Sequence, residues 1–140
     1  MRKNNNKNNF LPYNPGILPT RPAPKKGEKI TFEVKGYPPY KDRNFSIRNP
    51  KHPNYKTFVE LRKEAINAMA KRAWHFGPVE INFTLFAPEF EKNKSLSDYD
   101  GGIADTLDGS SGRDFTYLPI VFEDDCQIVI SHSKICKTQD

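Results

Sequence analysis

The chain has 140 residues, a formal net charge of +5, and 36% hydrophobic residues. This length suits one domain with a modest core, and no apolar run approaches the roughly 18 residues of a membrane span. No apolar stretch near the N-terminus indicates a secretory signal. The two cysteines, Cys126 and Cys136, favour a reducing, cytoplasmic compartment.

Positive charge is concentrated in the first part of the chain. Residues 1–51 contain twelve Lys and Arg against three Asp and Glu, a surplus of nine, whereas residues 52–140 contain ten against fourteen. Residues 1–28 are rich in Asn, Pro and Lys and are predicted to form a disordered tail, with residues 29–140 as the folded domain. The basic half either meets a phosphate backbone or is simply solvated.

The first predicted element is a strand at Lys29–Lys35, where Ile30, Phe32 and Val34 alternate with polar residues. A loop with four prolines follows, from Gly36 to Pro53. It interleaves aromatic and basic side chains, which are Tyr37, Tyr40, Lys41, Arg43, Phe45, Arg48 and Lys51. Such a loop either contacts nucleic acid, with cations on phosphates and rings on splayed bases, or is a surface loop whose rings pack on the core.

A helix is predicted from the capping-box pattern at Thr57 to about Ala73, because apolar residues recur there at helical spacing. A second strand is predicted at Val79–Leu85 from strict alternation. The polar loop 89–97 then leads into an acidic stretch, Asp98–Gln127. The expected fold is α+β, a small mixed β-sheet packed by one long and one short helix in the order β-α-β-α-β. The first helix fits a parallel crossover or an α+β arrangement.

Carboxylates cluster at both ends of the acidic stretch. Asp98 and Asp100 are two residues apart, so in an extended chain they would point to one face. A short helix is predicted at Ile103–Leu107. Asp124 and Asp125 precede a predicted strand at 126–135. Carboxylates gathered by folding need a compensating cation, and Mg²⁺ suits an all-oxygen site. The alternative is a set of solvated acidic loops. The spacing does not fit an EF-hand.

The order of these motifs resembles the RusA-type Holliday-junction resolvases. The similar segments are Asp-x-Asp at 98–100, Asp-x-Leu at 105–107, Asp-Asp-x-Gln-Ile at 124–128, and Tyr-Pro-Pro-Tyr-Lys-Asp-Arg at 37–43. The resemblance covers about residues 29–136. It implies a small homodimer that cuts branched DNA, in recombination and repair, with Mg²⁺ or with Mn²⁺ in its place.

Carried over by position, the resemblance assigns metal binding and catalysis to Asp98, Asp100 and Asp125, with Asp124 as a further metal ligand. Arg43 matches the arginine that follows the family's Pro-Pro loop. By charge, Lys41, Arg48 and Arg113 are further candidate DNA contacts, and Arg113 lies in the long segment 110–121.

The chain also departs from the family pattern. Gly101 stands where the family has Asn, and Ala104 stands where it has Lys. In the expected mechanism the metal ion polarises the scissile phosphate and activates a water. Arg113, Lys41 or Arg43 would then supply the missing positive charge. Two other hypotheses remain, a non-catalytic DNA-binding protein on the same scaffold and a metal nuclease for other branched DNA.

Overall fold

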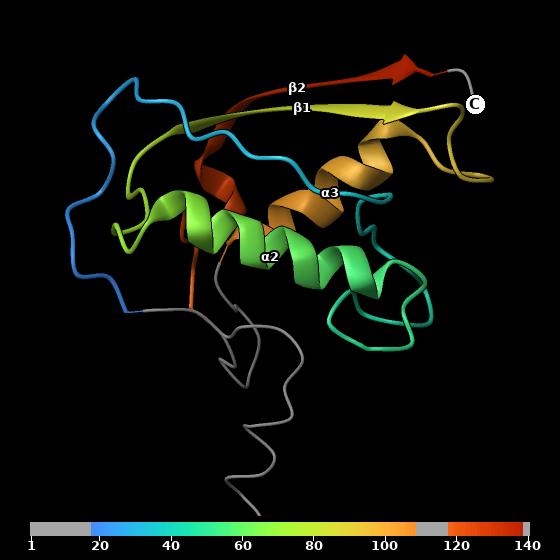
Figure 1. Ribbon diagram of the computed structural model, residues 1–140, viewed down its shortest axis with the longest axis horizontal. Helices are drawn as coiled ribbons and strands as arrows, with labels where there is room; N and C mark the ends of the chain where they lie inside the picture. Colours follow the sequence, from blue (N-terminus) through green and yellow to red (C-terminus); the bar gives the residue numbers. More distant parts are fainter. Residues whose placement is uncertain (1–17, 109–117, 139–140) are drawn as a thin grey trace, which may run out of the picture.

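Two helices and a two-stranded parallel sheet form the regular structure (Figure 1). The structure is a computed structural model that describes residues 18–108 and 118–138. In chain order the elements are α2 (Tyr55–Met69), β1 (Val79–Ala87), α3 (Leu96–Leu107), the 3-10 turn η1 (Asp125–Gln127) and β2 (Ile128–Lys137). Both helices lie on the same side of the two strands (Figure 1). The α+β class is therefore confirmed.

The predicted β-α-β-α-β order is not formed, because residues 29–35 are not a strand. Ile30, Phe32 and Val34 do pack against the core, while the residues between them are exposed. No backbone hydrogen bond joins 29–35 to another described segment. The alternation reports burial of one side of an extended chain. It does not specify a neighbouring strand to complete a ladder.

The sheet consists of β1 and β2, paired in parallel from Val79 opposite Ile128 to Ala87 opposite Lys137. One register shift, a bulge-like irregularity, lies between Val79 and Glu80. Helix α3 belongs to the connection between the strands, as parallel pairing requires a crossover. The strand predicted at Val79–Leu85 is confirmed and extends two residues further.

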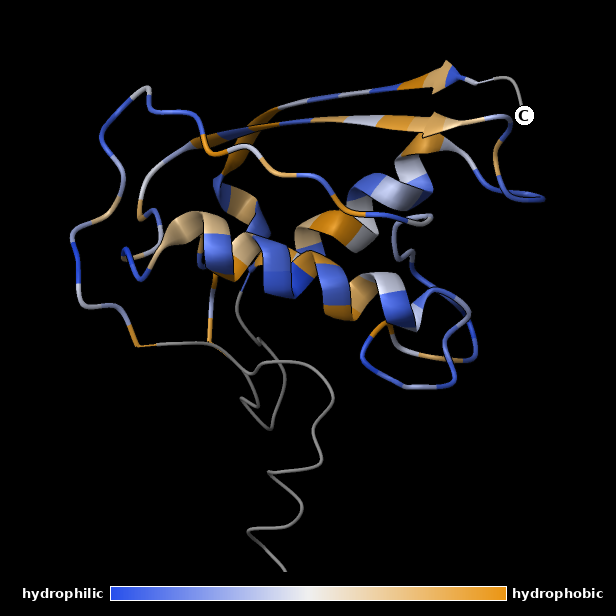
Figure 2. Ribbon diagram, in the orientation of Figure 1, coloured by the Kyte–Doolittle hydropathy of each residue, from blue (hydrophilic) through white to orange (hydrophobic). Residues whose placement is uncertain are grey.

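Helix α2 begins two residues before the predicted start and ends four residues before the predicted end. It ends because Ala70 adopts a left-handed conformation (φ 51°), and its N–H donates to the carbonyls of Ile66 and Asn67. Lys71 is left-handed as well (φ 65°). Thr57 does not cap the helix; it is buried within the first turn. Hydrophobic and hydrophilic residues alternate along α2, which fits a helix with one solvent face (Figure 2).

The core lies between the helices and the sheet. Its main cluster contains Leu61, Ala65, Met69, Ile103, Ala104, Leu107, Ile120 and Phe122. The fully buried Arg62 of α2 donates to the carbonyls of Thr106 (3.0 Å) and Leu118 (3.4 Å), so it joins α2 to the end of α3. No helix in the described part of the chain is long and apolar enough to cross a membrane.

Part of the predicted tail lies outside the described residues, but residues 18–28 are placed against the end of α2. The N–H groups of Thr20 and Arg21 donate to the carbonyl of Lys71, and that of Ala73 donates to the carbonyl of Arg21. The Arg21 guanidinium donates to the carbonyl of Ala70 (3.0 Å). The segment therefore follows the C-terminal end of α2, whose last carbonyls attract positive charge.

Candidate metal and DNA-binding site

Asp98 and Asp100 lie in the first turns of α3, not in an extended chain. The Asp98 carboxylate accepts hydrogen bonds from the N–H (2.7 Å) and Oγ (3.0 Å) of Ser95, and the two residues form a capping box in which the Ser95 side chain accepts from the Asp98 N–H. Asp100 accepts a hydrogen bond from Ser133 Oγ in β2 (3.3 Å). Because helical residues two apart do not face each other, the expectation that this pair shares one face was wrong.

The Asp124–Asp125 pair lies in a turn organised by Gln127. The side-chain oxygen of Gln127 accepts from the N–H groups of Glu123 (2.9 Å) and Asp124 (3.0 Å). Its amide nitrogen donates to the carbonyls of His75 (2.9 Å) and Gly77 (2.8 Å). The Gln of the Asp-Asp-x-Gln segment thus fixes the pair beside the chain that leads into β1.

The three predicted metal ligands do not converge in this structure. Asp100 bonds to Ser133, which lies five residues beyond Ile128, or roughly 16 Å along β2 at 3.3 Å per residue. Asp125 lies before Ile128. Ligands of one Mg²⁺ each lie only about 2.1 Å from the ion. In the described part of the chain, no group of three or more His, Cys, Asp and Glu side chains forms a metal-binding set.

Two other carboxylates, at the C-terminal end of α3, interact electrostatically with Asp124 and Asp125. Asp108, which is 9% exposed, has a pKa of about 8, raised mainly by burial and then by the charge of Asp105, with Asp125 and Asp124 contributing. Burial also raises the pKa of Asp105. We call Asp105, Asp108, Asp124 and Asp125 the acidic cluster. These carboxylates lie close enough to perturb one another's protonation.

Within the acidic cluster, the two carboxyls of the turn are coupled. A hydrogen bond with Asp124 raises the pKa of Asp125, and partial burial and the charges of Asp124 and Asp105 add to this effect. The hydrogen bond from the Cys126 N–H (3.0 Å) is the main reason that the pKa of Asp124 is lowered. Two neighbouring carboxyl groups whose pKa values shift in opposite directions provide oxygen ligands that a divalent cation can take once both are deprotonated.

The proline-rich loop runs beside α3 and brings positive charge to the acidic cluster. The backbone contact is close at Gly102, where an added Cβ would lie 1.9 Å from the carbonyl oxygen of Pro39. Further on, Arg48 donates to the carbonyl of Asp105 (2.9 Å), and its guanidinium lies 6.0 Å from the centroid of the Phe58 ring. The charges of Arg48 and Lys41 both act to lower the pKa of Asp105.

The predicted DNA contacts differ in their availability. Lys41 and Arg43 are exposed, whereas Arg48 is half-buried and bound to the α3 main chain. Arg113 lies outside the described residues. Arg48 therefore holds the loop to α3, whereas Lys41, Arg43 and Lys51 are exposed to solvent.

The rings of this loop are mostly part of the fold. Tyr40 is only 6% exposed and meets the fully buried Tyr99 edge to face, with Lys94 Nζ 4.0 Å from its ring centroid. Tyr37 donates its hydroxyl to the carbonyl of Glu89 (2.6 Å). Rings held in this way are not available to stack on bases. For Tyr40 the alternative, a ring packed on the core, is thus the correct one.

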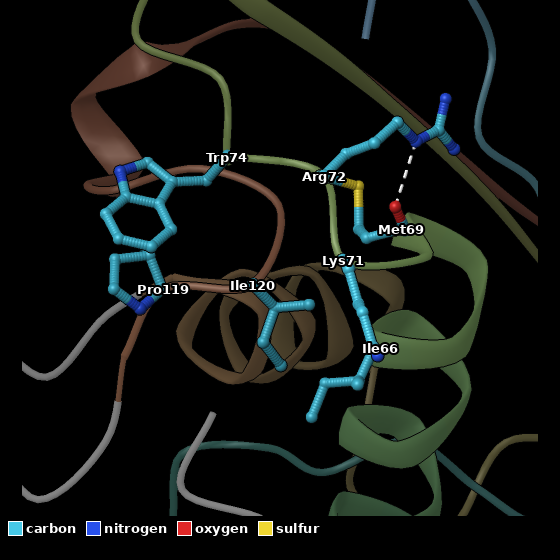
Figure 3. Close-up of a pocket in the computed structure, with 7 residues that line it drawn as sticks. All are labelled: Ile66, Met69, Lys71, Arg72, Trp74, Pro119 and Ile120. Atoms are coloured by element: carbon cyan, nitrogen blue, oxygen red, sulfur yellow. Dashed lines mark hydrogen bonds between the residues drawn. The ribbon is translucent and has the colours of Figure 1, made fainter. Parts of the chain in front are cut away.

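A small pocket lies elsewhere, at the end of α2 (Figure 3). At one side of the pocket, Arg72 Nε donates to the carbonyl of Met69 (2.9 Å). The lining residues are Ile66, Met69, Lys71, Arg72, Trp74, Pro119 and Ile120. None of them is acidic, so this pocket does not belong to the acidic cluster.

The sequence contained a partial signal for the acidic cluster. Asp105 lies in the segment predicted to be helical, and Asp108 directly follows the predicted end of that helix at Leu107. Burial at the end of α3 then places both near the turn before β2. The spacing of the Asp-x-Asp pair would place both carboxylates on one face only in an extended chain, and this segment is helical.

No protein-family model, no curated protein and no solved structure matches this chain. The resemblance to the RusA-type resolvases therefore rests on the sequence motifs alone.

Proposed function

We propose that this protein is a Mg²⁺-dependent endonuclease that acts on branched DNA, with its metal held at the acidic cluster. The observation that supports the proposal is the mutual electrostatic effect of four carboxylates from two segments of the chain, on which the charges of Lys41 and Arg48 also act. Mn²⁺ would substitute for Mg²⁺, since both prefer oxygen ligands. The two free cysteines fit a reducing, cytoplasmic compartment.

Mg²⁺ needs few protein ligands, because it keeps several waters and takes one or two carboxylates plus substrate phosphates. Asp124 and Asp125 are adjacent and already share a hydrogen bond, so they are the proposed ligands. Asp108 and Asp105 would hold waters of the ion or a second ion. Substrate phosphate would complete the ligand set. The ion would polarise that phosphate and lower the pKa of the attacking water.

The exposed cations Lys41 and Arg43 would contact phosphates next to the cleavage position, since phosphate contacts supply most of the affinity of such proteins. A two-fold homodimer would present two such sites to a symmetric junction and would make paired cuts. In this proposal Asp98 and Asp100 have structural roles, as the cap of α3 and its link to β2.

The experiment compares Asp125→Asn with Asp100→Asn, using a labelled four-way junction and Mg²⁺. Asp125→Asn should abolish cleavage and leave DNA binding, which depends on basic side chains. Asp100→Asn is the matched control, because it removes one carboxylate from the same region of sequence but not from the acidic cluster. It should still cut. Circular dichroism of both variants would establish that they fold.

Two results would contradict the proposal. If Asp125→Asn cuts as fast as the parent, the metal is not at the acidic cluster. If Asp100→Asn alone abolishes cleavage, the ligand set implied by the family resemblance holds, and the carboxylates come together only with metal and DNA. Comparing flaps, three-way and four-way junctions would define the preferred branched form.

One observation favours a second candidate, a DNA-binding protein without catalysis. Asp98 and Asp100 lie apart from Asp125, and Ala104, at the position of the family's lysine, is buried in the core. A RusA-like scaffold that had lost its catalytic side chains would show this arrangement. Calorimetric titration with Mg²⁺ and Mn²⁺ distinguishes the two, because the endonuclease should take up metal and the non-catalytic protein should not.

A further inference from the structure

His52 is nearly inaccessible, at 3% exposure, and uses both of its ring nitrogens. Nδ1 accepts a hydrogen bond from the N–H of Asn54 (2.9 Å), and Nε2 lies 2.7 Å from the carbonyl oxygen of Tyr40. A main-chain N–H only donates and a carbonyl only accepts. The arrangement therefore assigns the proton to Nε2 and leaves Nδ1 unprotonated, so the ring is neutral.

These two hydrogen bonds fix the proline-rich loop directly before its first basic residue, Lys41. The Tyr40 carbonyl that His52 binds belongs to the peptide group immediately before Lys41. Asn54, held by Nδ1, donates its side-chain amide to the carbonyl of Pro38 (2.9 Å) and to Glu91 (3.0 Å). Pro39 lies between these anchors and packs against α3 at Gly102. The loop is thus fixed on both sides of Pro39.

We propose that neutral His52 is a positioning residue that sets Lys41 and Arg43 for contact with DNA phosphates. Its role in DNA binding rests on the proposed function, but its hold on the loop does not. Protonating Nδ1 would place two N–H donors against each other at Asn54. The hydrogen bond between Asn54 and His52 would then be lost inside the protein, which is costly. Acid should therefore free the loop from its fixed position.

The groups around His52 carry both signs of charge. Asp42 lies on the same loop, and the positive form of His52 would attract it. Lys94 sits over the Tyr40 ring, which packs 4.7 Å from the imidazole. Glu91 binds Asn54 from the segment before α3. A protonated ring would gain from Asp42 and Glu91 and lose from Lys94. None of these charges removes the conflict between two donors at Asn54.

The sign of the pH effect makes the proposal testable. Acid ordinarily strengthens the binding of a protein to DNA, because protonation adds positive charge. If Lys41 and Arg43 lose their fixed positions, DNA binding should instead become weaker. We therefore expect the DNA affinity of the parent to fall as acid protonates His52, and the salt dependence to decrease by about one to two phosphate contacts.

The key variant is His52→Gln, whose amide can donate to the Tyr40 carbonyl but does not titrate. Its DNA affinity should not fall between pH 8 and pH 5 at constant ionic strength. His132→Gln is the matched control, because His132 is exposed on β2 and should leave the acid-sensitive profile of the parent unchanged. The same acid-induced fall in parent and His52→Gln would overturn the proposal.

A readout without DNA separates this inference from the proposed function. Long-range ¹H–¹⁵N spectra of the parent should show the proton on Nε2 at pH 8, and amide exchange at residues 40–43 should increase as the ring is protonated. A proton on Nδ1, or exchange that does not follow His52, would refute the inference even for a protein that binds no DNA. A parent that binds no branched DNA at any pH would refute the proposed function alone.

Discussion

Replacing Gly102 by Ala should destabilise the protein, although the residue lies inside a helix where Ala is normally preferred. The added Cβ would lie 1.9 Å from the carbonyl oxygen of Pro39, 2.3 Å from its carbonyl carbon and 2.8 Å from the backbone nitrogen of Tyr40. All three atoms belong to the main chain, so no rotamer change can relieve the overlap. The loop and α3 must move apart.

The magnitude follows from two opposing terms. Ordinary van der Waals contact is at roughly 3.5 Å, so the loop must retreat by about 1.5 Å, and overpacking of this kind costs about 1–3 kcal/mol or more. Helix propensity returns at most about 1 kcal/mol. We expect a net loss of about 2 kcal/mol in the free energy of unfolding, together with weaker DNA binding because Lys41 is displaced.

Gly101→Ala is a control at the next residue of the same helix. Nothing lies within 4 Å of its added Cβ, so only the propensity term applies and the variant should gain about 0.5–1 kcal/mol. Urea unfolding of the parent and both variants measures the comparison. The reasoning fails if Gly102→Ala is as stable as Gly101→Ala, because the close approach of loop and helix would then not exist.

Two further predictions concern charge and backbone conformation. Without divalent cations, folded Asp108 stays protonated to about pH 8, whereas the unfolded carboxyl ionises near pH 4, so its contribution to stability falls as the pH rises between these values. Relative to the parent, the free energy of unfolding of Asp108→Asn should therefore increase by on the order of 1 kcal/mol per pH unit in this window. Urea unfolding at pH 5 and pH 8 measures the difference. A gain in stability that does not depend on pH would contradict this prediction. Ala70→Gly should raise the melting temperature, because Gly relieves up to about 1 kcal/mol of left-handed strain at φ 51°. Ala68→Gly, within α2, is the control and should lower it. A lower melting temperature for both variants would refute the left-handed conformation of Ala70.

Several features could be read from the sequence because they depend on local pattern. The helical spacing of Leu61 and Ala65 predicted α2, and alternation predicted β1 and the one-sided burial of Ile30, Phe32 and Val34. Helix ends were less predictable, since no sequence rule signalled the left-handed Ala70. The missing strand at 29–35 has a related cause, because a ladder requires a partner that alternation does not name.

The site shows the same division between local pattern and tertiary structure. The sequence by itself determined that carboxylates would concentrate between Asp98 and Asp125 and that basic residues would follow Pro39. Only the tertiary structure decided which of them meet. Helix α3 begins at Leu96, earlier than predicted, so Asp98 belongs to its capping box and Asp100 bonds to Ser133 of β2. Asp105 and Asp108, at the other end of α3, interact electrostatically with the turn before β2. The physical reason is that spacing constrains neighbours within one element, whereas contacts between elements depend on how their buried faces pack.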